Sequence, residues 1–239
     1  MEGSAAASTF GTRSVQFLSD NQRINAFLAD PLQGAGPAPA VVILHEWWGL
    51  NEHIKDLAQR FGRAGYAALA VDLYSRMGSK VTADANEAAQ LMNALSSQLV
   101  LRDLNAATKY LTTHPLVDPL RIGVIGFCMG GTLALTAATH NSDLKAAVVF
   151  YGKVPPIESL ARLLSPVLYH YGAKDGWVTK QEVGVLQQGL EKFGKPGTVH
   201  IYPEAGHAFF NDTRPDVYRP EDAKLAWQRS LAFFAEYLR

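Results

Sequence analysis

The only cysteine of the 239-residue chain, Cys128, stands between two glycines, directly after a short apolar run and before a run of helix-forming residues. This order is typical of a nucleophile elbow, in which a G-x-S-x-G pattern turns sharply from strand to helix and presents the central side chain. Gly126 and Gly130 suit the turn, because a Cβ at either position would collide with the crowded strand and helix. Free N–H groups at the start of the helix favour a thiolate, so the sequence predicts an exposed and activated thiol.

A nucleophilic thiol needs a base, and the base needs an acidic partner that fixes its tautomer. Asp175 follows the apolar run at residues 167–171, and His207 follows the next such run, at 199–202. Taken singly, a cysteine is commonly a small buried residue and an Asp-Gly pair a common turn. The order nucleophile, acid, histidine, each after a strand, favours instead a catalytic triad with Cys128 at the carboxyl edge of a parallel sheet.

Alternating strands and helices are needed to bring these residues together. Residues 14–18 and 23–28 alternate polar and apolar side chains, which predicts an antiparallel hairpin at one edge of a sheet. Beyond the hairpin, apolar runs predict buried strands at 40–44, 66–71, 121–125, 146–150, 166–171 and 198–202. Helical periodicity predicts helices at 51–65, 83–95, 98–112, 129–140 and 180–193, and a last helix through Trp227 and Phe234. The sequence thus predicts one α/β domain over residues 13–239, with a doubly wound, mostly parallel sheet, after a loose tail at 1–12.

Composition narrows the partners and the compartment. The 22 Lys and Arg residues balance 22 Asp and Glu residues, so the net charge of zero gives no attraction to nucleic acid or to an anionic membrane. A lone cysteine cannot form an intramolecular disulfide, and no signal peptide or membrane-spanning apolar stretch stands out, so we expect a cytoplasmic protein. The glycine and histidine spacings fit neither a dinucleotide loop nor a metal site, so no cofactor and no metal are expected. The expected partner is a small-molecule substrate, and the oligomeric state is left open.

The chain resembles the dienelactone hydrolase family over nearly its whole length from about residue 13. The resemblance rests on six motifs: His45-Glu-Trp-Trp-Gly-Leu-Asn51, Gly65-Tyr-Ala67, Asp72-Leu-Tyr74, Gly126-Phe-Cys-Met-Gly-Gly131, the Gly172-x-x-Asp175 loop and Ala205-Gly-His207. It implies the α/β-hydrolase fold and a cytoplasmic enzyme that hydrolyses lactones or esters through a cysteine acyl-enzyme.

The resemblance also implies roles for three residues around the thiol. Glu46 would contact the resting thiol and help to switch Cys128 to a thiolate when substrate arrives, and the backbone N–H groups of Trp47 and Met129 would form the oxyanion hole. A carboxylate near a thiol raises the pKa of that thiol, so Glu46 makes chemical sense only as a proton acceptor. The plain structural alternative is a surface glutamate next to the start of a helix.

Departures from the family pattern bear on the substrate. Family members hold an anionic lactone with arginines, one of them four positions after the catalytic histidine, where this chain has Asn211. Near the second arginine position only Arg76 and Lys80 are cationic, and without a guanidinium clamp recognition of a carboxylate should weaken. We therefore predict a preference for neutral or aromatic substrates in an aromatic, largely apolar pocket. Its expected residues are Trp48, Arg76, Trp177, Phe209, Phe210 and Asn211.

Two other functions stay open at this point. The same triad could hydrolyse activated phosphoesters, since sequence does not fix which electrophile fits the pocket. The scaffold could also serve as a non-catalytic ligand-binding or thiol-sensing protein, for which a broken triad would be the sign. The intact order of Cys128, Asp175 and His207 favours catalysis over that alternative.

Overall fold

The computed structural model describes residues 11–32 and 36–239, and these form an eight-stranded sheet in the order β1-β2-β4-β3-β5-β6-β7-β8. The strands are β1 (Thr12–Ser19), β2 (Gln22–Ala29), β3 (Ala38–Leu44), β4 (Ala67–Val71), β5 (Val117–Phe127), β6 (Leu144–Phe150), β7 (Val167–Gly172) and β8 (Gly197–Tyr202). β1 and β2 form an antiparallel hairpin, β2 runs antiparallel to β4, and the strands from β4 to β8 are parallel to one another. The predicted hairpin and mostly parallel sheet are confirmed. Of the predicted tail, residues 1–10 lie outside the described residues, and β1 already begins at Thr12.

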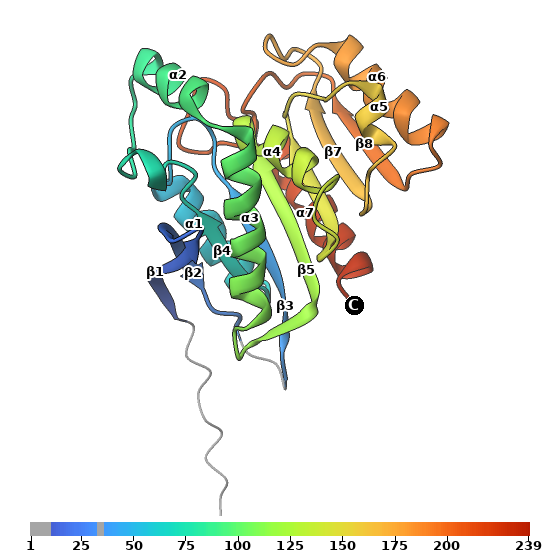
Figure 1. Ribbon diagram of the computed structural model, residues 1–239. Coiled ribbons are helices and arrows are strands. Elements are labelled where there is room, and N and C mark those ends of the chain that lie inside the picture. The colour runs from blue at the N-terminus through green and yellow to red at the C-terminus, as the bar shows by residue number, and fades with distance from the viewer. Residues whose placement is uncertain (1–10, 33–35) are drawn as a thin grey trace, which may run out of the picture.

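Helices cover both faces of the sheet. They are α1 (Glu52–Arg63), the 3-10 turn η1 (Ser75–Met77), α2 (Ala85–Ala94), α3 (Ser97–Thr112), α4 (Met129–Ala137), α5 (Ile157–Leu160), α6 (Lys180–Lys192) and α7 (Pro220–Tyr237). In Figure 1, α3 crosses the front of the sheet beside α4, and α7 lies behind it. The longer helices match the predicted ones, whereas η1 and α5 were not predicted, because elements of three and four residues are too short to show a periodicity.

α1 shows how local sequence sets an element. Asn51 caps it, because its side-chain oxygen accepts a hydrogen bond from the N–H of Ile54 at 3.2 Å. Apolar residues at helical spacing are buried, and Phe61 among them packs against Trp227 of α7 with ring centroids 4.6 Å apart. Gly65, with a φ of 91°, then lets the chain leave the helix and enter β4. α1 and α7 thereby share one face of the sheet.

The parallel strands place their carboxyl ends at one edge of the sheet, the upper edge in Figure 1. The segments that follow β3, β5, β7 and β8 carry Glu46, Cys128, Asp175 and His207 respectively. In open α/β sheets, ligands bind outside these carboxyl ends. The fold therefore gathers at one edge the four side chains that the sequence singles out for chemistry.

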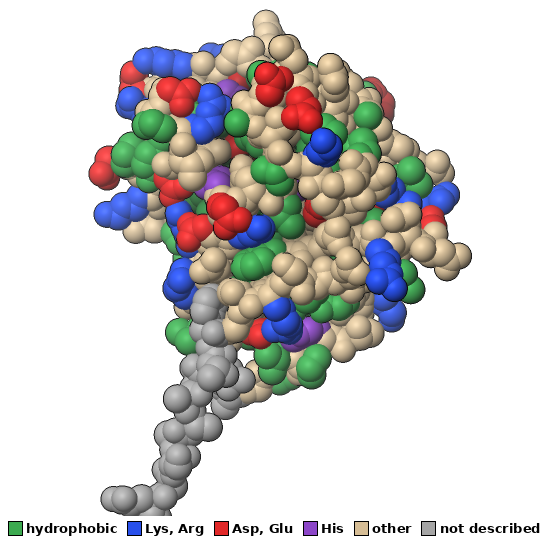
Figure 2. Space-filling view, turned by 90° about the vertical axis from the view of Figure 1, so that its left-hand side faces the viewer, with side chains coloured by type: hydrophobic (Ala, Val, Ile, Leu, Met, Phe, Trp, Pro, Cys, Tyr) green, Lys and Arg blue, Asp and Glu red, His purple; other side chains and the backbone are tan. Residues whose placement is uncertain are grey.

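The surface shows no dominant sign of charge on the face in view. Figure 2 shows Lys and Arg side chains intermixed with Asp and Glu side chains on this face, in keeping with the net charge of zero. Within the residues that the structure describes, no helix has the length and apolar character needed to cross a membrane.

His170 lies in the core between the sheet and α7, with no exposed surface. Its Nδ1 is 2.9 Å from the hydroxyl of Tyr202, and its Nε2 is 3.1 Å from the hydroxyl of Ser230. The Ser230 hydroxyl donates to the carbonyl of Ala226, so it accepts from His170, and the neutral form of the imidazole carries its proton on Nε2. Burial, with the nearby His200 and Arg229, lowers the pKa of His170 well below its ordinary value.

This buried imidazole makes stability depend on pH. Because the pKa of His170 is lower in the folded than in the unfolded chain, the unfolded chain binds more protons below about pH 6.5, and stability is lost as the pH falls from there. One such histidine lowers the free energy of unfolding by up to about 1.4 kcal/mol per pH unit in this range. Urea unfolding should show a lower free energy of unfolding at pH 5.5 than at pH 7.5. In the variant His170→Gln, whose side chain cannot titrate, the difference between the two pH values should be smaller. An unchanged pH slope in the variant would contradict the assignment.

Candidate active site

Cys128 occupies a strained turn between β5 and α4. Its φ of 54° and ψ of −117° are rare for a residue with a side chain. A Cβ at Gly126 would lie 2.0 Å from the carbonyl oxygen of Gly130, and a Cβ at Gly130 would lie 2.2 Å from that of Leu44. Both glycines are therefore required by close backbone approach, which is the steric basis of an elbow.

The thiol of Cys128 is buried, with only 6% of the residue exposed. Burial is the main cause of a raised thiol pKa, and the negative charge of Glu46 raises the pKa further. Hydrogen bonds from the backbone N–H groups of Met129 and Trp47 act in the opposite direction but do not outweigh them. The sequence-based prediction of an exposed, activated thiol is wrong, because the desolvation exceeds the effect of the helix N-terminus. The resting group is a protonated thiol held by two backbone donors.

Asp175 and His207 form a close pair. Nδ1 of His207 is 2.8 Å from Oδ2 of Asp175, whose side chain is fully buried, whereas a quarter of the His207 side chain is exposed. The other oxygen, Oδ1, accepts the N–H groups of Trp177 at 2.7 Å and Val178 at 2.9 Å. The ring of Trp177 also packs edge-on against His207, with centroids 5.0 Å apart. A histidine held in this way can accept and return a proton, because the carboxylate fixes its tautomer and stabilises its positive form.

Glu46 lies buried between two polar side chains, with 2% of the residue exposed. Its Oε2 accepts a hydrogen bond from Nδ2 of Asn211 at 2.7 Å, and its Oε1 accepts a longer one from the hydroxyl of Tyr151 at 3.4 Å. The charge of Glu46 acts on the thiol by raising the pKa of Cys128, while its hydrogen bonds go to Asn211 and Tyr151. Glu46 is thus a buried residue of the site and not a surface glutamate at the start of α1.

The loop that carries Trp47 is held by the residues around it. The Tyr74 hydroxyl donates to the carbonyl of Trp47 at 2.9 Å, and the N–H of Thr82 donates to the carbonyl of Trp48 at 3.1 Å. Gly49 has a φ of 90°, and a Cβ there would lie 2.2 Å from the carbonyl oxygen of Lys80. Only glycine fits where the loop passes this close to the backbone of Lys80. The two hydrogen bonds and this close packing together fix the position of the loop.

A cavity of about 380 Å³ opens beside Asn211. Its lining residues are Trp48, Asn51, Thr82, Ala83, Asn211, Thr213 and Arg214. Asn211 joins the cavity to the site, because the same side chain binds Glu46. The guanidinium of Arg214 lies 5.8 Å from the ring centroid of Trp48, and it also donates to Asp216 at 2.8 Å. Arg214 was missed by sequence reasoning, which looked for a cation only at position 211 and near residue 76.

The other expected pocket residues lie elsewhere. Phe209 and Phe210 are buried in the aromatic core, where Phe209 packs on Tyr202 and Phe210 on Phe150, both with centroids 4.8 Å apart. Arg76 is held by two hydrogen bonds to the carboxylate of Asp103, at 2.9 and 2.6 Å, so its charge is already neutralised.

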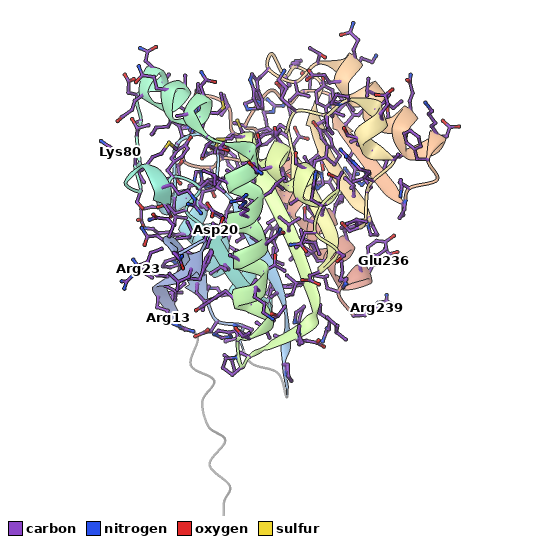
Figure 3. All side chains as sticks on the ribbon, viewed as in Figure 1. Arg13, Asp20, Arg23, Lys80, Glu236 and Arg239 are labelled. Carbon is purple, nitrogen blue, oxygen red and sulfur yellow. The ribbon has the colours of Figure 1, made fainter. Side chains whose placement is uncertain are left out.

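Lys80, the other cation near the second arginine position, projects outward in Figure 3. It is exposed and lies 3.8 Å from a carboxylate oxygen of Glu87.

Tyr151 was not predicted from the sequence. It follows β6 at the carboxyl edge of the sheet, with a φ of 41°, and its ring packs against His207 with centroids 5.0 Å apart. Its position directly after a strand, like that of Cys128, is the signal that could have found it. Among the described residues no cluster of three or more His, Cys, Asp or Glu side chains could hold a metal ion.

Comparison with known proteins decides the family. The sequence profile of the dienelactone hydrolase family matches residues 24–238. The chain belongs to the dienelactone hydrolase family. A Yersinia pestis protein named "Putative carboxymethylenebutenolidase" is 35% identical over 231 residues, which cover 92% of this chain and 86% of that protein.

Solved structures of dienelactone hydrolases share the fold. The crystal structure of a "Putative Dienelactone Hydrolase" from Klebsiella pneumoniae superposes with a TM-score of 0.90 at 34% identity, covering 96% of this chain and 100% of the other. A dienelactone hydrolase-like promiscuous phosphotriesterase from metagenomic libraries superposes with a TM-score of 0.88 at 26% identity, covering 96% and 99%. The protein is therefore a hydrolase of the dienelactone hydrolase family with the α/β-hydrolase fold, as its sequence predicts.

Proposed function

We propose that this dienelactone hydrolase family member cleaves esters or lactones through a covalent acyl-enzyme on Cys128. The observation that carries the proposal is the hydrogen-bonded pair of Asp175 and His207 at the same sheet edge as an elbow cysteine whose sulfur two backbone N–H groups contact. A base with a fixed tautomer, a nucleophile and two oxyanion donors are the parts that acyl transfer needs.

In the first half-reaction the sulfur of Cys128 attacks the carbonyl carbon after its proton has left. The carbonyl oxygen becomes an oxyanion that accepts from the N–H groups of Trp47 and Met129. The proton that left the thiol reaches Nε2 of His207 by way of Glu46, and His207 gives it to the leaving oxygen as the C–O bond breaks, so that a thioester remains. In the second half-reaction His207 takes a proton from water, the hydroxide attacks the thioester, and the acid product leaves as His207 returns that proton to the sulfur and the thiol is restored.

Glu46 is the proposed first acceptor of the thiol proton, which it passes on to His207. The raised pKa of Cys128 means that the resting thiol is not a nucleophile, and of the two carboxylates that raise this pKa, Glu46 has the larger effect and Asp175 the smaller. A substrate that displaces the sulfur from its backbone donors would bring the proton to this carboxylate. The thiol would then react only when a substrate is present.

The proposed substrates are neutral or aromatic esters and lactones. The position that carries an arginine in the family pattern is Asn211, and its amide is already committed to Glu46 at 2.7 Å. Arg214 is the one cation among the described residues that line the cavity, and it is itself paired with Asp216 at 2.8 Å. The amide of Asn211 carries no charge, and the charge of the Arg214 guanidinium is already balanced by a carboxylate. Both groups should therefore bind a free carboxylate only weakly.

A panel of substrates tests this function. Neutral aryl esters, neutral lactones and carboxylate-bearing lactones should be compared by kcat/KM in wild type, Asn211→Arg and Arg214→Met. We expect wild type to turn over the neutral classes best and Asn211→Arg to gain on the anionic lactones. A wild-type preference for anionic lactones that Arg214→Met removes would overturn the proposed specificity, and absence of turnover on every class would overturn the function.

A second candidate reaction is the hydrolysis of activated phosphotriesters. It is favoured by the similarity, at 26% identity, to a dienelactone hydrolase-like phosphotriesterase. Phosphotriester turnover that exceeds carboxyl ester turnover would support it, whereas stoichiometric inactivation of Cys128 would reject it. For the compartment we propose the cytoplasm, since the lone cysteine gives the fold no disulfide to form.

A further inference from the structure

His45 is a fully buried histidine directly after β3, and the steps described above do not use it. Its Nδ1 lies 2.5 Å from the carbonyl oxygen of Glu46, and its Nε2 accepts a hydrogen bond from the N–H of Leu73 at 3.1 Å. Both ring nitrogens are therefore bound to backbone. The chain thus places a polar side chain in its core next to the peptide bond that joins Glu46 to Trp47.

The two contacts fix the protonation of the ring. Because Nε2 accepts the N–H of Leu73, it carries no proton, and the proton of the neutral ring sits on Nδ1. Nδ1 then donates to the carbonyl of Glu46. Burial lowers the pKa of His45, which keeps the ring neutral, although the carboxylate of Asp72 at 4.0 Å from Nε2 acts in the opposite direction. The ring is thereby a fixed donor to this one carbonyl.

The carbonyl of Glu46 and the N–H of Trp47 belong to the same peptide unit. The described part of the chain has no cis peptide bond, and in a planar trans peptide the C=O and the N–H point in opposite directions. A donor that holds the carbonyl on one side therefore aims the N–H on the other side. That N–H contacts the sulfur of Cys128.

We propose that His45 is a positioning residue that aims the oxyanion donor of Trp47 through the carbonyl of Glu46. The inference rests on the proposed acyl transfer, in which this N–H binds the developing oxyanion. The second donor to the carbonyl, the N–H of Gly49, is longer at 3.3 Å, so the peptide is held loosely when the imidazole is removed. Tyr74 holds the next peptide, through the carbonyl of Trp47, and so cannot take over the role of His45.

A matched pair of variants separates the donor from the packing. His45→Asn keeps an N–H donor at the δ position, and His45→Leu has nearly the same shape without a donor. Both variants lose the acceptor for the N–H of Leu73. The difference in kcat between them therefore measures the effect of the hydrogen bond to the carbonyl of Glu46. Since loss of a whole oxyanion donor costs about 10²–10³ in kcat, we expect His45→Leu to lose about 10- to 100-fold in kcat and His45→Asn to lose about threefold or less. KM should change little in either variant.

A second measurement separates positioning from a general structural role. Acylation of Cys128 by an aryl ester passes through an oxyanion, whereas alkylation by iodoacetamide does not, so His45→Leu should slow acylation far more than alkylation. Equal kcat values for the Asn and Leu variants, or an equal slowing of both reactions, would overturn the proposal. If wild type shows no turnover dependent on Cys128, it is the proposed function that fails, and this result is distinct from either outcome in the His45 variants.

Discussion

A Cys128→Ala variant should lose at least about four orders of magnitude in kcat/KM for any ester or lactone that wild type hydrolyses. The reason is that the elbow presents one nucleophile, and the chain has no second cysteine that could replace it. Oxyanion donors and substrate binding remain in the variant, so a small residual rate above that of water is expected. Initial rates over a range of substrate concentrations measure the loss.

The control for this variant is a measurement showing that it folds like wild type. Alanine tolerates the positive φ of 54° no worse than cysteine, so the unfolding temperature should move by only a few degrees. In wild type, intact-protein mass spectrometry during turnover of a slow substrate should show one acyl adduct, and peptide mapping should place it on Cys128. A Cys128→Ala variant that retains most of its esterase activity would contradict the mechanism in which Cys128 is the nucleophile.

The fold and the order of the site residues could be predicted because they depend on local sequence. Glycines bracket Cys128 because strand and helix approach within van der Waals contact, and this requirement leaves a pattern of five residues. Asp175 and His207 each follow an apolar strand, and parallel pairing of β7 with β8 brings the ends of these strands together. The register of a parallel sheet therefore turns spacing along the chain into proximity in space.

The state of the thiol could not be predicted in the same way. Its raised pKa depends on burial and on Glu46, whose carboxylate partners are 105 and 165 positions further along the chain, in Tyr151 and Asn211. Local sequence shows the helix N-terminus that favours a thiolate, but not the packing that removes water from the sulfur. Desolvation is a property of the assembled fold, and here it outweighs the local effect.

The pocket residues were the least predictable part of the site. Aromatic residues after a catalytic histidine can face either a cavity or the core, and Phe209 and Phe210 face the core. Arg76 is neutralised by Asp103, a residue 27 positions away on α3, so a contact outside its own segment removes it from the pocket. Arg214 reaches the cavity because the chain after Asn211 turns back, through a bond from its N–H to the carbonyl of Asn211 at 3.1 Å.

Backbone strain gathers where the strands end. Of the six non-glycine residues with positive φ in the described part of the chain, Cys128, Tyr151 and Ala208 follow β5, β6 and β8 at the site edge. Such conformations cost of order 1–3 kcal/mol each and persist only where the surrounding structure imposes them. At Cys128 and Tyr151 the strained residue carries a side chain that contacts the site, and Ala208 directly follows His207. The strain therefore coincides with the turns that direct these side chains.

Asp175→Asn should lower kcat by about 10³–10⁴-fold without a comparable change in KM. The structure fixes how the new amide would sit. Oδ1 accepts two backbone N–H groups, from Trp177 and Val178, and only the oxygen of an asparagine can keep these bonds. The NH₂ group would then face Nδ1 of His207, where a carboxylate oxygen now lies at 2.8 Å.

The loss follows from the tautomer of His207 and not from the charge alone. An amide donor facing Nδ1 turns that nitrogen into an acceptor and moves the ring proton to Nε2, so the ring can no longer take up the thiol proton from Glu46 or a proton from water. Glu204→Gln is the matched control, because it removes a carboxylate from the neighbouring exposed pair with Lys174 without touching His207. We expect the control to keep wild-type kcat and Asp175→Asn to keep a wild-type unfolding temperature. An Asp175→Asn enzyme within about tenfold of wild type would mean that the pair orients His207 without setting its proton, and that another group serves as the base.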